Sequence, residues 1–425
     1  MITPFYILFG FGLFSIVLHR TALLKPFALI AFVLGGYFSS VFGADDMKLF
    51  EMIVMLVLFA FVLHEREDIT ITQTLFLGAS SLLLLESDTI LSFVIAFESL
   101  SLISVIVVSY MRTKEEVEGA VKMFIAGAMA TGFLFFGVAF YLMGGGDLQE
   151  ALHPKSSYFE LIGVFMMLLA LFYKLTLVPF HGWAVDSYAK VSPANAALLS
   201  GVAKTVALLG VFKIFEPFLA EHLSFAVPFF IIVALITMTL GNFLALFRKR
   251  LSEILAYSSI AHAGYMALAF VALSSSYAHD GVLYMAIAYI FMQSAAFLIL
   301  DTLKEKYNIV SITDLNGFAK QNPLLGALLT IQLFSLAGIP LLAGFLAKAV
   351  LFYAVVDAGL WWVALIALLN SALSVAYYAM IVKSIYFEKL DAKAVTISNK
   401  TTAFAAQIIL VAGTLFFGVF AGDVL

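Results

Sequence analysis

The sequence is poor in the residues from which most cofactor sites are built. It contains no cysteine, which excludes disulfides and cysteine-ligated zinc or iron–sulfur centres. No glycine-rich loop with a basic partner offers a phosphate site, and no histidine pair has the spacing of a metal or haem site. No long basic run suggests nucleic acid. The chain is therefore expected to hold no cofactor and no metal of its own and to bind no nucleic acid.

Charge is also scarce. Only 12% of the 425 residues are charged, about half the share of a soluble domain. Hydrophobic residues make up 63%, and apolar runs near the ~20 residues needed to cross a bilayer recur from end to end. This composition predicts an all-α polytopic membrane protein with about 14 transmembrane helices.

The basic residues are distributed unevenly between the loops. When the predicted spans alternate, sixteen of the 23 lysines and arginines fall on one side, three on the other and four inside spans. Because basic loops stay in the cytoplasm, this bias predicts that both termini are non-cytoplasmic.

Two of the predicted spans are too long for a single crossing. Residues 158–190 and 323–355 would each extend roughly 50 Å as one helix, and they contain Pro179 and Pro340 near their middles. Paired interrupted spans indicate inverted repeats around a midplane site. We therefore expect two inverted five-helix repeats with broken helices 7 and 12. The predicted units are an N-terminal three-helix segment (1–69), a first repeat (70–213), a second inverted repeat (223–386) and a C-terminal helix (387–425).

Four ionisable residues lie well inside predicted spans, where each is costly and needs a reason. They are Glu98, Lys174, Lys204 and Lys348. Burial disfavours the charged form of a lysine and a nearby carboxylate favours it, so such a pair can act as a switchable proton carrier. Structural explanations remain open: a carboxylate pinned by serines, lysines bonded to carbonyls freed by a proline, structural ion pairs, and, for Lys348, extension to a membrane interface.

Three further residues are weaker candidates. Lys122 lies near the start of a span, where extension to the interface competes with function. His181 follows the first break and His262 lies in AYSSIAHAGYM. Histidine suits proton relay near neutral pH, although a lone histidine in a span is often only satisfied by a hydroxyl.

Several segments resemble a known family, the antiporter-like membrane subunits of proton-pumping NADH:quinone oxidoreductase (respiratory complex I). The family also includes subunits of multisubunit sodium/proton antiporters and membrane-bound hydrogenases. The resemblance rests on YKLTLVPFHGWAVDSY (173–188), GNFLALFRKRLSEILAYSSIAHAGYM (241–266) and FSLAGIPLLAGFLAKAVLF (334–352). FESLSL (97–102), EGAVKMFIAGAMATGFLFFG (118–137) and LNSALSVAYYAMIV (369–382) resemble the subunit N group within it.

The resemblance implies roles for the residues that match the family's motifs. Glu98, Lys174, Lys204 and Lys348 match a central polar axis, and Lys122 matches a basic residue at the start of helix 6. Ser252 and Glu253 stand where the family usually has a basic pair, which leaves any role of that pair unassigned.

The implied function is proton translocation as a non-redox subunit of NADH:quinone oxidoreductase in a bacterial inner membrane. NADH, FMN, iron–sulfur clusters and quinone would then belong to partner subunits. One alternative is a subunit of a multisubunit cation/proton antiporter without redox coupling, because one fold serves both. A scaffold with an inactive axis is another. A lipid-modifying membrane enzyme would need clustered polar residues at one interface, and the sequence shows none.

Overall fold

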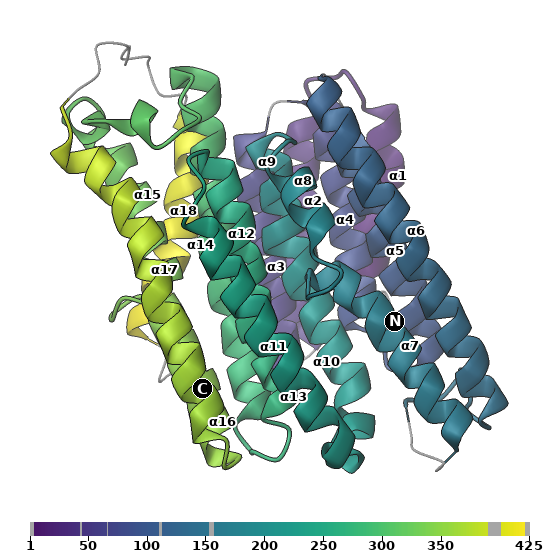
Figure 1. Ribbon diagram of the computed structural model, residues 1–425. Coiled ribbons are helices and arrows are strands. Elements are labelled where there is room, and N and C mark those ends of the chain that lie inside the picture. Colours follow the sequence, from purple (N-terminus) through teal and green to yellow (C-terminus); the bar gives the residue numbers. More distant parts are fainter. Residues whose placement is uncertain are drawn as a thin grey trace.

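The protein is described by a computed structural model that covers residues 4–42, 45–65, 67–109, 113–152, 157–389 and 401–420. Within these residues the chain is helical, with one isolated β-bridge between Arg250 and Ser311 and no strand. The long helices lie side by side in one bundle (Figure 1). The expected all-helical fold is confirmed.

The first half of the chain forms the elements from α1 to α10. They are α1 (Pro4–Val17), α2 (Leu24–Phe42), α3 (Asp46–His64), α4 (Asp68–Leu85), α5 (Ile90–Ser109), α6 (Lys114–Met143), α7 (Tyr158–Leu175), α8 (Gly182–Tyr188), α9 (Pro193–Ala196), the π-helix η1 (Ala197–Ala203) and α10 (Lys204–Glu221). The start of α6 is fixed by a capping box, in which Thr113 Oγ1 accepts from the Glu116 N–H and the Glu116 carboxylate accepts from the Thr113 N–H.

The second half forms the remaining elements. They are α11 (Leu223–Ala245), α12 (Leu251–Met266), α13 (Leu268–Val271), α14 (Ala278–Tyr307), the 3₁₀ turns η2 (Thr313–Leu315) and η3 (Phe318–Lys320), α15 (Pro323–Ala337), α16 (Ala343–Asp357), α17 (Trp361–Phe387) and α18 (Thr401–Val419). The predicted end of the first repeat, residue 213, lies inside α10, which continues to Glu221. The division into repeats stays a prediction.

Twelve helices of the described chain are long and apolar enough to cross a bilayer. Two shorter apolar helices, α1 and α15, accompany them. The polytopic membrane fold is thus confirmed, whereas the count of fourteen spans stays a prediction.

Helices α7 and α15 each end shortly before one of the two prolines singled out in the sequence, Pro179 and Pro340. Thr176 follows α7 with φ 59°, and Gly338 follows α15 with φ 87°. In both places the next residue closes the helix end: Leu177 N–H donates to Phe172 O (2.9 Å), and Ile339 N–H donates to Phe334 O (3.0 Å). This is the Schellman arrangement, which satisfies carbonyls that a helix end leaves open.

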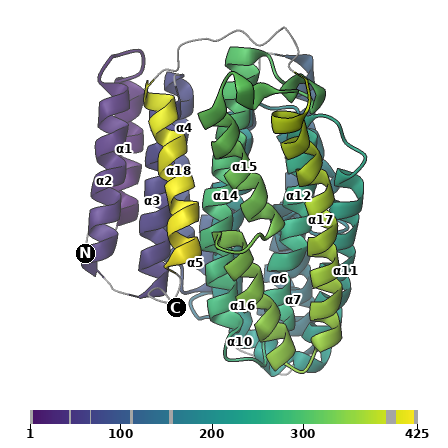
Figure 2. The ribbon, with the colours of Figure 1, turned by 90° about the vertical axis from the view of Figure 1, so that its left-hand side faces the viewer.

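Helix α14 lies at the centre of the bundle. Every residue in its most apolar 18-residue stretch is buried, and the helix contacts α3, η1, α15, α16 and α18. The last helix, α18, packs against α3 and α14, so segments from opposite ends of the chain lie side by side (Figure 2). As a result, the apolar middle of α14 is enclosed by protein.

The start of α1 and the end of α18 lie at the same end of the bundle (Figure 2). The loop after α14 lies at the opposite end (Figure 2), and Arg250, in the loop between α11 and α12, is joined to it by the bridge to Ser311. This end, which also carries Arg248 and Lys249, is called the basic end here. Five basic residues used in the charge count lie outside the described residues: Arg66, Arg112, Lys155, Lys393 and Lys400.

Candidate functional site

Glu98 and Lys174 lie on neighbouring helices. Glu98 on α5 is half-buried, and both its carboxylate oxygens accept from Thr131 Oγ1 on α6 (3.1 and 3.0 Å). Lys174, in the last turn of α7, is buried and interacts electrostatically with Glu98. No ion pair within 4.0 Å joins them in the described part of the chain. The carboxylate is held by a threonine, not by serines, and it acts on the lysine from a distance.

Lys174 is anchored on α5. Its Nζ donates to Ser104 Oγ (2.8 Å) and to Leu100 O (3.2 Å). Neither group belongs to the interruption at Pro179, so the interpretation that Lys174 satisfies carbonyls freed by the proline is wrong. Its place two residues before Thr176 nevertheless sets it beside the helix end.

Lys204 connects the first interruption to α12. It follows the π-helix η1 and is only 1% exposed. Its Nζ donates to Thr176 Oγ1 (2.8 Å) and to the hydroxyl (2.5 Å) and carbonyl (3.1 Å) of Ser259. A β-branched residue in the left-handed region costs about 1–2 kcal/mol, and here the strained residue supplies an acceptor to a buried lysine.

Hydroxyl groups continue from Lys204 toward α14. Ser259 Oγ bonds Ser200 Oγ (2.9 Å), Tyr289 OH donates to Ser259 Oγ (2.9 Å), and Gln293 Nε2 donates to Ser200 Oγ (3.0 Å). All of these side chains are buried. We call the set the Lys204 junction: Thr176, Ser200, Lys204, Ser259, Tyr289 and Gln293.

His262 lies between Lys204 and Lys348. It is fully buried, one turn beyond Ser259 on α12, and interacts electrostatically with both lysines. Its Nδ1 bonds Ser258 O (2.9 Å), so Nδ1 carries the hydrogen and the neutral ring keeps Nε2 as an acceptor. Nε2 has no partner in the described structure. The interpretation of a histidine satisfied by a hydroxyl therefore does not hold.

Lys348 closes the series at the second interruption. Its Nζ donates to Leu336 O (2.8 Å), Ala337 O (3.2 Å) and Ser371 Oγ (3.0 Å), and it lies 5.0 Å from the centre of the Tyr265 ring. With 4% exposure the side chain does not extend to a membrane interface. Here, and not at Lys174, a lysine binds carbonyls at the end of an interrupted helix.

Lys122 and His181 lie apart from this series. Lys122 is 42% exposed and pairs with Glu118 (2.6 Å) and Asp186 (2.9 Å), while Lys190 also pairs with Glu118 (2.9 Å). Exposed pairs of this kind are screened by solvent and contribute little to stability. His181 precedes α8 and is half-buried. Over the described ranges, no hydrogen bond links either residue to the Lys204 junction.

The arrangement as a whole is a series of buried titratable groups, and one of them, Lys204, is bonded to a network of hydroxyls. Among the residues that the structure describes, no cluster of three or more His, Asp or Glu could hold a metal ion. Lysine, histidine and hydroxyl groups can exchange protons, and chains of hydrogen bonds between them support proton relay. The series defines the class of protein: a polytopic membrane protein with a polar axis through its interior.

The chain belongs to the NADH:quinone oxidoreductase/Mrp antiporter membrane family, whose model matches residues 87–374. It is 32% identical over 363 residues to F(420)H(2) dehydrogenase subunit N of Methanosarcina mazei, covering 82% of this chain and 73% of that protein. It is 32% identical over 361 residues to NADH-quinone oxidoreductase subunit N 1 of Chloroherpeton thalassium, covering 81% and 74%. The expected family is confirmed.

Solved structures show the same fold. A chain of respiratory complex I from Thermus thermophilus superposes with a TM-score of 0.85 at 24% identity, over 99% of this chain and 98% of that chain. A chain of the Mrp complex from Dietzia sp. DQ12-45-1b also gives 0.85, at 20% identity, over 100% and 95%.

Proposed function

We propose that the chain is a proton-translocating membrane subunit of an oxidoreductase of the NADH:quinone type. The observation that carries this proposal is the buried series from Lys174 through the Lys204 junction and His262 to Lys348. Electron transfer would take place in partner subunits, which would hold NADH, FMN, iron–sulfur clusters and quinone. The two relatives name different electron donors, so the part shared with this chain is the membrane subunit.

The relatives favour this function over the antiporter alternative. The two relatives, each 32% identical to this chain, are named as subunits of redox enzymes. The likeness to the Mrp complex, at 20% identity, concerns the fold, which both kinds of assembly use. A subunit working without redox input remains the second candidate.

The chain would lie in the inner membrane of a bacterium with its basic end in the cytoplasm. Since the chain has no cysteine, single-cysteine variants allow a direct test. Thr113 lies at the start of α6, and Ser276 lies in the exposed loop before α14, at the other end of the bundle. The two variants are Thr113→Cys and Ser276→Cys. In intact cells, a membrane-impermeant thiol reagent is expected to label Ser276→Cys only. Labelling of Thr113→Cys alone would reverse the orientation.

The experiment for the function combines purification with a substitution. Tagged chain purified from native membranes is expected to bring redox subunits with it. Glu98→Gln keeps the acceptor for Thr131 but removes the charge that acts on Lys174, so we expect intact assembly and proton pumping reduced about tenfold. Pumping and quinone reduction are measured together in vesicles.

Glu98→Asp is the matched control and is expected to be milder, because it keeps the charge. Thr131→Val is the second control, because it removes the hydrogen bond to the carboxylate and leaves the charge. Full quinone reduction with full pumping in Glu98→Gln would contradict the role of Glu98. Purification with other antiporter subunits, and no redox subunit, would favour the alternative function.

A further inference from the structure

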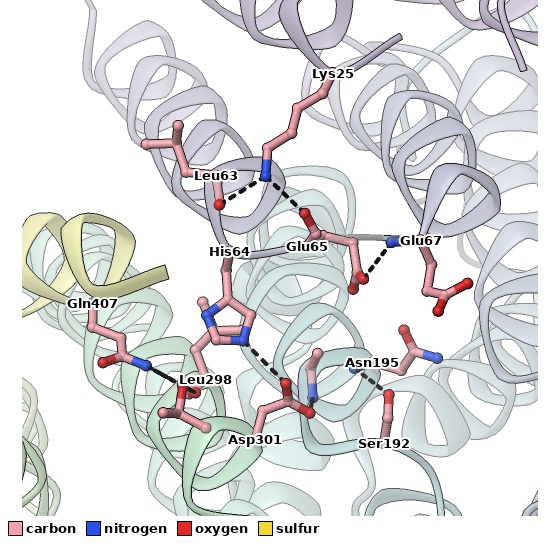
Figure 3. A network of polar contacts seen from close by, with 12 residues as sticks. Lys25, Leu63, His64, Glu65, Glu67, Ser192, Asn195, Leu298, Asp301 and Gln407 are labelled. Atoms are coloured by element: carbon pink, nitrogen blue, oxygen red, sulfur yellow. Dashed lines mark hydrogen bonds and ion pairs between the residues drawn. The ribbon is translucent and has the colours of Figure 1, made fainter. Parts of the chain in front are cut away.

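A second buried charged group lies at the basic end, outside the series described above (Figure 3). Asp301, near the end of α14, is 6% exposed. Its Oδ2 bonds His64 Nε2 at the end of α3 (3.0 Å), and its Oδ1 accepts from the Ala194 N–H of α9 (3.2 Å). A carboxylate this deep in a helix bundle is costly to keep, and neither Asp301 nor His64 has a place in the polar axis.

Asp301 faces two cavities of about 190 and 120 Å³, which also share Glu65, Glu67 and Glu305 as lining residues. Each is large enough for several waters, since one water occupies about 30 Å³ of liquid. Charged groups that line them besides these are Glu116, Lys304 and Lys306. We call the two cavities together the acidic vestibule. Carboxylates around water attract protons to the surroundings of Asp301.

Two elements lead from Asp301 to the Lys204 junction. Ala194, which donates to Asp301, begins the segment that runs through η1 to Lys204. On α14, Gln293 lies eight residues before Asp301, roughly 12 Å along the helix. Gln293 Oε1 and Ser294 Oγ are buried on this path and have no partner in the described structure. They offer polar sites along the seam between α14 and η1.

The seam is closed by apolar side chains. Phe61, Leu198 and Leu298 line a void beside Ser294 that is too narrow for water. Phe61 lies one turn before His64 on α3, so the same helix supplies the partner of Asp301 and part of the constriction. These apolar side chains therefore separate Asp301 from the Lys204 junction.

We propose that Asp301, positioned by His64, is the proton-uptake group that loads the Lys204 junction from the basic end. A hydronium ion in the acidic vestibule gives up a proton: one of its O–H bonds breaks, a water is left behind, and an O–H bond forms on Asp301. When the seam hydrates, that proton passes along water and the Ser294, Ser200 and Ser259 hydroxyls to the neutral amine of Lys204. The carboxylate is thereby restored. This inference rests on the proposed function.

The test uses the assembled complex in inverted membrane vesicles, whose outer solution bathes the basic end. Asp301→Asn keeps the shape and an acceptor for Ala194 but does not carry a proton. We expect about tenfold slower initial proton uptake at alkaline outer pH, with a smaller deficit as the outer solution is acidified. Asp301→Glu is expected to restore most of the rate.

Gln407→Leu is the matched control. It removes a hydrogen bond that pins α18 to the same end of α14, from Gln407 Nε2 to Thr302 Oγ1 (2.7 Å), without lining the vestibule. We expect wild-type pH dependence in this variant. A deficit in Asp301→Asn that is equal at every outer pH would show that the pair only joins α3 to α14 and would overturn the inference.

Lys204→Met in the same vesicles separates the two proposals. If Lys204→Met fails to pump while Asp301→Asn pumps normally at every pH, the proposed function stands and the uptake role of Asp301 is wrong. If Lys204→Met pumps normally, the proposed function itself fails.

Discussion

Lys204→Met is expected to abolish proton pumping, with a loss of at least about a hundredfold. Methionine keeps much of the volume of lysine but breaks the connection between Thr176 on the first interruption and Ser259 on α12. Within the described residues, neither Lys174 nor Lys348 donates a hydrogen bond to the Lys204 junction. Initial pumping rates in vesicles, with the quinone reductase rate recorded in parallel, measure the effect.

Two companion variants separate charge from position. Lys204→Arg keeps the charge but does not release a proton under ordinary conditions, so it is also expected to be impaired. Thr176→Gly relieves the left-handed backbone and removes the acceptor, so a folded complex with slower pumping is expected. Normal pumping in Lys204→Arg would make Lys204 a structural residue.

Lys348→Ala is expected to block proton release more than uptake and to slow quinone reduction with it. Lys348 lies at the second interruption, in the repeat predicted to be inverted, where a half-channel would lead to the opposite side of the membrane. The proton-gradient and the reductase rate are measured together. Wild-type levels of both, or water access to Lys348 from the cytoplasm alone, would rule out a role in release.

The structure calls for a control at this position. Alanine also strips Leu336 O of the Lys348 donor, and an unsatisfied buried carbonyl costs about 1–3 kcal/mol. Ala337 O loses the same donor but keeps a hydrogen bond from Ser371 Oγ (3.3 Å). Lys348→Arg keeps donors at these carbonyls, so assembly is expected to recover while release stays slow. Thr414→Val serves as a packing control, since it removes a buried bond to Gln332 on α15 and leaves Lys348 alone.

Two signals allowed the sequence to predict the helices and the buried lysines: the hydropathy of the spans and the rarity of ionisable residues inside them. Apolar runs locate the helices, because the bilayer demands the same composition of every span. Ionisable residues inside such runs are rare, so Glu98, Lys174, Lys204 and Lys348 stood out, and the structure buries the three lysines. Their functional roles stay predictions. The same rule also selected Lys122, whose ion pairs lie on the surface.

Contacts between distant, ordinary residues could not be predicted in the same way. Thr176, Ser200 and Tyr289 belong to residue types that are common in membrane helices, so nothing in their local sequence separates them from their neighbours. His64 and Asp301 are 237 residues apart, and each falls at the edge of an apolar run, where a polar residue is ordinary. Only the packing of α3 against α14 brings them together.

Helices α14 and α6 show how little hydropathy says about a helix's surroundings. Their most apolar 18-residue stretches have mean hydropathies of 1.9 and 2.0. In α14 all residues of that stretch are buried, whereas in α6 only 22% of them are buried. Lipid adapts to any apolar shape, whereas a protein interior is packed to fixed neighbours. Most positions of α6 can therefore drift among apolar residues over evolution, while each position of α14 is constrained in size and shape. Divergence within the family should thus accumulate on α6 and spare the central helix.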